Sequence, residues 1–140
     1  MGAALGIDWG SKRSGFAITD ALRIALEPLP PQELAGESEE LLDHVATLLD
    51  ERVIDTFVLG LPLNMDGTEG PMVTRVRAFA GRLSQRFPSV RLAFQDERLS
   101  TKEAEDWMRE AEIPVKERRA IRDSASAAVI LRDWIGAGEP

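Results

Sequence analysis

Two runs of hydrophobic residues near the start of the chain, separated by a short polar segment, predict neighbouring β-strands. Apolar segments cover residues 3–9 and 14–19, and the four residues 10–13 between them are Gly, Ser, Lys and Arg. This arrangement predicts a tight β-hairpin. A third short strand is predicted over 24–27, before a cluster of prolines. The chain therefore opens with neighbouring antiparallel strands.

Strands and helices alternate in the rest of the chain. The nearly continuous apolar run 56–63 is typical of a central strand covered on both faces, and 90–95 alternates like a strand. Ser100 and Glu103 fit a capping box that begins a helix. Helices are predicted over residues 37–52, 71–87 and 100–112, and within 116–135. Together these elements predict an α/β fold, with a mixed five-stranded sheet flanked by helices.

Length and composition narrow the possible functions. The 140 residues suit a single domain over 1–140, with no segment able to span a membrane and no signal peptide, so we expect a cytoplasmic protein. A net charge of −7 argues against a generally basic surface that coats nucleic acid. The chain has no cysteine, no tyrosine and only one histidine, His44. Carboxylates are therefore the groups left for metal binding or acid–base chemistry.

Three acidic residues occupy unusual positions in this pattern. Asp8 ends the first strand, and Glu97 follows the strand 90–95. Asp123 shares one face of its predicted helix with apolar residues, including Ala127 and Trp134. A charged group that faces a core needs a partner or a cation. Three such carboxylates suit Mg²⁺ or Mn²⁺, and two such ions can activate water and stabilise the leaving oxygen in phosphodiester cleavage.

Each carboxylate also has an ordinary explanation. Asp8 could be a turn residue, Asp123 could cap the start of a helix, and Glu97 could pair with a cation on the surface. The spacing of the three residues does not decide between these explanations and a metal site.

Basic residues lie close to each of these carboxylates in the sequence. Lys12 and Arg13 follow Asp8, Arg98 is next to Glu97, and a basic stretch that ends in Arg122 precedes Asp123. Contacts with phosphate groups would account for this placement in an acidic protein. Salt bridges to the many glutamates would account for it equally well.

Four segments of the chain resemble, in the same order, the signature motifs of the YqgF/RuvX family. They are GIDWGSKRSGFAITD, GLPLNMDGTEGP, DERLST and DSASAAVIL, and the resemblance covers essentially the whole chain. It implies an RNase H-like fold related to the RuvC resolvases. It also implies that Asp8, Glu97 and Asp123 form an acidic triad that binds two Mg²⁺ or Mn²⁺ ions and carries out catalysis. By the same resemblance, Asn64 and Thr68 lie in a loop near the active edge.

The resemblance implies a metal-dependent nuclease that processes the 5′ end of pre-16S rRNA in ribosome biogenesis. The alternative within the family is a Holliday junction resolvase that acts on branched DNA. In either case we expect Lys12, Arg13, Arg98 and Arg122, together with Asn64 and Thr68, to contact nucleic acid. The sequence does not choose between single-stranded or structured RNA and branched DNA, nor between a monomer and a homodimer.

Two other classes of protein stay open at this stage. The stretch DWGSKRSG also resembles the phosphate loop of actin-like ATPases and sugar kinases, but those enzymes need two such domains and this chain has room for one. A noncatalytic RNA- or ribosome-binding module is the second alternative, because an RNase H-like scaffold does not guarantee activity.

Overall fold

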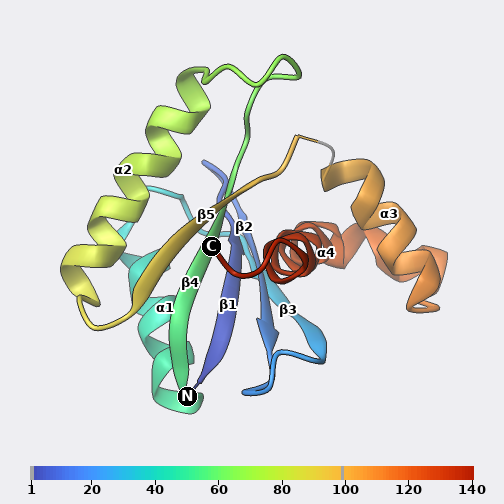
Figure 1. Cartoon of the computed structure of the whole chain (residues 1–140), viewed down its shortest axis with the longest axis horizontal. Helices are drawn as coiled ribbons and strands as arrows, with labels where there is room; N and C mark the ends of the chain where they lie inside the picture. The colour runs from blue at the N-terminus through green and yellow to red at the C-terminus, as the bar shows by residue number, and fades with distance from the viewer. Residues whose placement is uncertain (1, 99) are drawn as a thin grey trace.

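The structure, a computed structural model, describes residues 2–98 and 100–140, and of Ser100 and Thr101 it describes the backbone alone. The elements along the chain are β1 (Ala3–Asp8), β2 (Ser14–Thr19), β3 (Leu26–Gln32), α1 (Glu39–Glu51), β4 (Ile54–Leu61), α2 (Pro71–Arg86), β5 (Arg91–Asp96), α3 (Ser100–Glu110) and α4 (Val115–Gly136). The five strands form one sheet in the order β3-β2-β1-β4-β5 (Figure 1). The first three strands pair antiparallel, whereas β4 and β5 are added in parallel. The predicted mixed sheet is therefore confirmed.

The helices cover both faces of this sheet. α1 connects β3 to β4, which pairs in parallel with β1, and α2 connects β4 to its parallel neighbour β5. Figure 1 shows α1 and α2 on one face and α4 crossing the other face, with α3 lying outside α4. None of the described helices is both long enough and apolar enough to cross a membrane.

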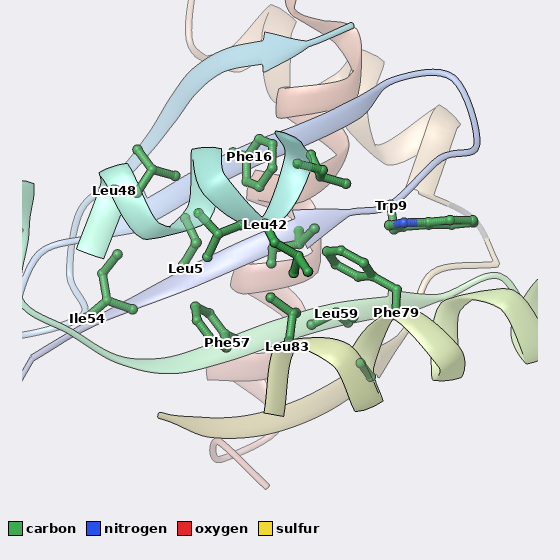
Figure 2. Packing of buried hydrophobic residues seen from close by; sticks show 14 of the residues in the cluster. Leu5, Trp9, Phe16, Leu42, Leu48, Ile54, Phe57, Leu59, Phe79 and Leu83 are labelled. Carbon is green, nitrogen blue, oxygen red and sulfur yellow. The ribbon is translucent and has the colours of Figure 1, made fainter. Parts of the chain in front are cut away.

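The larger hydrophobic core lies between the sheet and the helices α1 and α2. Figure 2 shows Leu5 and Phe57 of the sheet facing Leu42 of α1 and Leu83 of α2. These residues are the odd-numbered positions of β1 and β4, together with helical positions spaced three or four apart. Trp9 belongs to this core too: it is buried beside Phe79, and its indole N–H donates to the carbonyl of Gly36.

The opposite face of the sheet is lined by small residues, so α4 lies close to the strands. Ala4 and Ala17 contact the α4 side, where Ala127 and Ala128 are fully buried. α3 does not join this layer but packs on α4 through Met108. The even-numbered residues of β1 therefore point toward α4, and Asp8 continues that row.

Two details differ from the sequence prediction or lie beyond the described residues. The third strand runs over Leu26–Gln32 rather than 24–27, and so includes Pro28, Pro30 and Pro31. Proline lacks the N–H that a ladder needs, but β3 is at the edge of the sheet and pairs only with β2, so the missing donors are tolerated. The predicted capping box depends on the Ser100 side chain, which lies outside the described residues.

Candidate active site

Asp8 lies at the end of β1, on the face of the sheet that α4 covers. β1 alternates between the two layers, with Leu5 and Ile7 in the core under α1 and α2 and Ala4 under α4. Ala4 and Asp8 are both even-numbered residues of β1, so their side chains point to the same face of the sheet. The half-buried carboxyl group of Asp8 therefore lies at the rim of the α4 layer. Because of this alternation, the carboxyl group at the end of this apolar strand is directed toward α4 rather than into solvent.

Glu97 meets Asp8 across the strand between them. It follows β5, and its backbone N–H donates to the carbonyl of Leu61 on β4 at 3.1 Å. A Cβ atom placed on Gly60 of β4 would lie 2.7 Å from the Glu97 carboxyl group and 2.5 Å from Ile130 Cδ1. Because Gly60 has no side chain, the Glu97 carboxyl group can lie over β4 and share a hydrogen bond with Asp8.

Burial dominates the ionisation of this pair. It raises the pKa of Asp8 to about 7, with the charge of Asp123 acting in the same direction and the hydrogen bond from Glu97 acting against it. Burial also raises the pKa of Glu97 to about 10, with further contributions from Asp8 and Asp96. The two carboxyl groups therefore hold a proton at neutral pH, and Glu97 is the donor in their hydrogen bond.

Asp123 is carried to the same edge by α4. It lies in the third turn of that helix, not at the N-cap position, so the capping explanation is wrong. A Cβ atom on Gly15 would collide with the Asp123 carbonyl oxygen, and Ser124 Oγ accepts a hydrogen bond from the Phe16 N–H at 3.2 Å. The helix backbone is thus pressed against β2 at this residue. As predicted, Asp123 shares its face with buried Ala127 and other apolar residues.

The Asp123 carboxylate contacts a cation rather than the other two acids. Its Oδ2 atom lies 2.8 Å from Arg13 Nε. In the described part of the chain, no group of three or more carboxylate, histidine or cysteine side chains is arranged to hold a metal ion. Asp8 and Glu97 touch, and Asp123 is near enough to raise the pKa of Asp8.

The donor set nevertheless fits a hard divalent cation. Asp8 and Glu97 are two adjoining carboxyl groups, and among the described residues neither forms an ion pair. Two carboxylates removed from water need a cation or a proton, and here they hold a proton. Carboxylate oxygens are the ligands that Mg²⁺ and Mn²⁺ prefer, so a metal ion would replace that proton.

Two of the predicted phosphate contacts border this edge directly. Lys12 and Arg13 lie in the turn between β1 and β2 and line a hollow of about 430 Å³ that Asp8, Asp123 and Met72 also line. Both cationic side chains are exposed.

Arg98, another predicted contact, has partners within the protein, as Arg13 does. Arg98 lies 2.8 Å from the Asp96 carboxylate and donates to the carbonyl of Met65 at 3.2 Å. It therefore ties the end of β5 to the loop between β4 and α2. Of the two neighbouring acids in the DERLST motif, Asp96 pairs with Arg98 and Glu97 contacts Asp8.

The loop between β4 and α2 holds its shape through its own polar groups. The Asn64 side chain donates to Thr68 Oγ1 at 3.0 Å, and the Thr68 hydroxyl and N–H both donate to Asp66. In Figure 1 this loop projects beyond the same end of the sheet to which β5 leads. The loop that carries Asn64 and Thr68 thus lies at this end of the sheet, and the two side chains are bonded to each other.

Arg122 lines a second hollow, which Arg13 and Asp123 also line. Its Nε atom lies 2.9 Å from Glu105 of α3. This hollow has a volume of about 850 Å³ and is lined mainly by cations, namely Arg13, Lys116, Arg119 and Arg122, with Glu33 and Asp123 among its other lining residues.

Gly60 is the residue of this site that the sequence reasoning missed. Its signal was present, because a glycine inside the apolar run 56–63 interrupts an otherwise continuous strand pattern. A glycine within a strand often marks a place where another group approaches the backbone closely.

Solved structures with the same fold bind branched DNA. The chain resembles the fowlpox virus resolvase in complex with Holliday junction DNA, with a TM-score of 0.62, 11% sequence identity and 99% of both chains covered. It also resembles RuvC of T. thermophilus in complex with a Holliday junction substrate, with a TM-score of 0.58, 12% identity and coverage of 99% of this chain and 98% of that chain. The fold is therefore of the RNase H-like class found in resolvases.

Sequence comparison identifies the family. The chain belongs to the RuvX family, described as Holliday junction resolvase, which it matches over residues 2–137. A Rhodobacter capsulatus relative named "Putative pre-16S rRNA nuclease" is 43% identical over 132 residues, covering 94% of this chain and 82% of the relative. A Porphyromonas gingivalis relative of the same name is 36% identical over 137 residues, covering 96% of each. The predicted family is confirmed, and its members are named as nucleases.

Proposed function

We propose that this protein is a divalent-metal-dependent nuclease that processes the 5′ end of pre-16S rRNA. The observation that carries the proposal is the buried contact between Asp8 and Glu97 across Gly60, with Asp123 beside it. Burial disfavours the charged forms of two adjoining carboxyl groups, so such a pair does not help a protein to fold. Pairs of this kind are found mainly at functional sites, which supports a catalytic role. The names of the relatives supply the substrate. A role in rRNA processing also predicts that the protein works in the cytoplasm.

Asp8, Glu97 and Asp123 would hold the metal ion or ions in this proposal. A bound Mg²⁺ or Mn²⁺ would activate water and stabilise the leaving oxygen, so the protein needs no histidine for acid–base work. Glu97 would release its proton as the cation binds, and Asp123 would turn from Arg13. Gly60 and Gly15 keep the backbone close enough for these side chains to share one edge.

The cations beside this edge would hold the substrate backbone. The protein carries a net charge of −7, so phosphate groups are repelled from most of its surface. Lys12 and Arg13 offer exposed positive charge where Asp8 lies. Arg98 would act mainly by fixing the loop that carries Asn64 and Thr68, because its guanidinium group already binds Asp96 and Met65.

A Holliday junction resolvase is the second candidate, because the family is described by that activity. A resolvase that cuts two strands symmetrically would need a two-fold dimer. A noncatalytic binding module is a further outcome that the experiment must be able to detect.

The test compares wild type with Asp8→Asn on labelled single-stranded RNA, on an RNA that carries the 5′ precursor of 16S rRNA, and on a four-way DNA junction. Each substrate is incubated with EDTA, Mg²⁺ or Mn²⁺. Asp50→Asn is the matched control, because Asp50 is an exposed aspartate on α1, on the opposite face of the sheet. We expect metal-dependent cleavage of the precursor RNA that is lost in Asp8→Asn and kept in Asp50→Asn.

Each other result has a defined meaning. Cleavage of the junction but not the RNA would select the resolvase. Binding of RNA without cleavage under any metal condition would select the binding module. Cleavage by a folded Asp8→Asn protein at the wild-type rate would show that the carboxyl pair is not the catalytic centre.

A further inference from the structure

Arg13 lies between two hollows. One contains Asp8 at the acidic edge formed by Asp8, Glu97 and Asp123, and the other is the basic hollow lined by Lys116, Arg119 and Arg122. The Arg13 guanidinium group pairs with Asp123 at 2.8 Å, and the two residues together line both hollows. The Arg13 side chain is 66% exposed and the Asp123 side chain 32%. The contact therefore lies at a surface that a metal ion and a nucleic acid can both reach.

The ion pair opposes metal binding at Asp123. The guanidinium group occupies one carboxylate oxygen and places a positive charge where a divalent cation would have to approach. Exposed ion pairs are weak, because water and salt screen both partners. Arg13 can therefore leave Asp123 when a stronger anionic partner is present.

A phosphodiester backbone in the basic hollow would be such a partner. Lys116, Arg119 and Arg122 project from successive turns of α4 into this hollow, and Arg13 completes its wall from the turn between β1 and β2. A guanidinium group matches the oxygens of a phosphate through paired N–H donors, which a lysine cannot do. Of the described residues that line this hollow, only Glu33 and Asp123 are negatively charged, although Arg122 also pairs with Glu105 at 2.9 Å.

We propose that Arg13 exchanges Asp123 for the phosphodiester backbone of the substrate, so that nucleic acid binding frees Asp123 to hold the metal ion. This inference rests on the proposed function, since it describes how nucleic acid regulates metal binding at the same site. Without substrate, Arg13 keeps the site weak for metal. Because coupling between two ligands is reciprocal, nucleic acid would strengthen metal binding and metal would strengthen nucleic acid binding.

The experiment measures Mn²⁺ affinity without nucleic acid, from the electron paramagnetic resonance signal of free Mn²⁺. Wild type is compared with Arg13→Gln, with Lys12→Gln and with Asp123→Asn. Lys12→Gln is the matched control, because Lys12 is the neighbouring exposed cation in the same turn and is in no recorded ion pair among the described residues. We expect Arg13→Gln to bind Mn²⁺ about five-fold or more tightly than wild type. Lys12→Gln should show a much smaller gain, and Asp123→Asn should bind more weakly.

A second readout follows Arg13 itself. The ¹⁵Nε resonance of Arg13 is recorded in EDTA, before and after a short single-stranded RNA is added. We expect RNA to move this resonance, and Asp123→Asn to move it without RNA. Both Arg13→Gln and Lys12→Gln should weaken RNA binding, but only Arg13→Gln should also tighten Mn²⁺ binding by about five-fold or more.

The outcomes separate this inference from the proposed function. Equal Mn²⁺ affinities for Arg13→Gln and Lys12→Gln, with Asp123→Asn still weakened, would overturn the exchange while leaving the metal site in place. An Arg13 resonance that does not respond to bound RNA would also overturn it. If neither wild type nor Arg13→Gln binds Mn²⁺, both the exchange and the metal-dependent nuclease are overturned.

Discussion

Glu97 reaches Asp8 across Gly60, although Asp8 ends β1, Glu97 follows β5, and these two strands do not pair with each other. β1 and β5 both pair with β4, so the strand between them decides whether their terminal side chains can meet. A side chain at position 60 would fill the space that the Glu97 carboxyl group occupies. The site thus depends on the absence of one side chain as much as on the presence of two carboxyl groups.

The carboxyl pair predicts that the metal-free protein loses stability as the pH rises. The folded state holds protons on Asp8 and Glu97, with pKa values of about 7 and about 10, that the unfolded chain releases near pH 4. Stability from these groups is therefore complete below about pH 4, and it is lost as the pH rises through about 7 for Asp8 and about 10 for Glu97. Each proton that only the folded state holds contributes about 1.4 kcal/mol per pH unit, over about two units for Asp8 and three for Glu97, so we expect a loss of at most about 7 kcal/mol between pH 5 and pH 8.

Urea unfolding in EDTA measures this loss, with Asp8→Asn as the comparison. The substituted side chain is an amide that cannot ionise, so the variant should show a flatter pH dependence and greater stability at pH 8. The charge of Asp123 raises the pKa of Asp8, and the charge of Asp96 raises the pKa of Glu97. Arg13 pairs with Asp123, so the variants compared must keep all three of these charged residues. His44, whose pKa is lowered by burial, changes stability in the opposite direction below about pH 6.5, but equally in both proteins. Parallel curves for the two proteins would contradict the prediction.

Metal addition should reverse the loss. A cation that binds only the folded state stabilises it, and here it must displace the protons of Asp8 and Glu97. We therefore expect Mn²⁺ to raise the melting temperature more at pH 8 than at pH 6, by several degrees at saturation. Thermal melts with Mn²⁺ or EDTA measure the shift. Asp50→Asn should show the full shift and Asp8→Asn almost none, whereas equal shifts in both would place the metal elsewhere.

Gly60→Ala should damage the site and the fold together. Its Cβ atom would lie 2.5 Å from Ile130 Cδ1 and 2.7 Å from the Glu97 carboxyl group, so one of them must move. We expect a loss of about 1–3 kcal/mol in the free energy of unfolding. Cleavage should fall by about 100-fold, because a displacement of about 1 Å at a catalytic group has effects of that order.

Gly81→Ala provides the control for this change. Gly81 lies in α2, and a Cβ atom there would have nothing within 4 Å. Alanine favours a helix over glycine by about 0.5–1 kcal/mol, so this variant should be slightly more stable and fully active. Wild-type activity in Gly60→Ala would show that Glu97 does not need its present position.

Much of the fold could be predicted from local patterns, because the spacing of apolar residues indicates which face of each strand and helix is buried. The exception was β3, where prolines were read as the end of a strand. Their tolerance depends on β3 being at the sheet edge, which is a property of strand order rather than of local sequence.

The candidate site was less predictable, because its contacts join residues far apart in the chain. The strand pattern placed Asp8 at the end of the first strand, and helical spacing placed Asp123 on the apolar face of its helix. Nothing in the spacing indicated that Glu97 would cross β4, or that Arg13 would bind Asp123. Partners of surface cations such as Arg122 are equally unpredictable, because many acidic residues could serve and the tertiary fold selects one.

Ser124→Ala should loosen the contact that positions Asp123. The register of β2 against β3 shifts between Ser14 and Phe16, and the Phe16 N–H donates to Ser124 Oγ at 3.2 Å. Alanine at this position would leave the buried donor without a partner, which should lower the free energy of unfolding by about 1–3 kcal/mol.

Ser126→Ala is the matched control, because Ser126 is also buried on α4 and has no recorded side-chain hydrogen bond in the described part of the chain. Urea unfolding should separate the two variants by at least about 1 kcal/mol. Because Asp123 precedes Ser124 and its backbone rests on Gly15, Ser124→Ala should also weaken Mn²⁺ binding. If both serines give the same stability and the same Mn²⁺ affinity, the hydrogen bond to Phe16 does not hold α4 against β2, and Asp123 is positioned by the close approach at Gly15 alone.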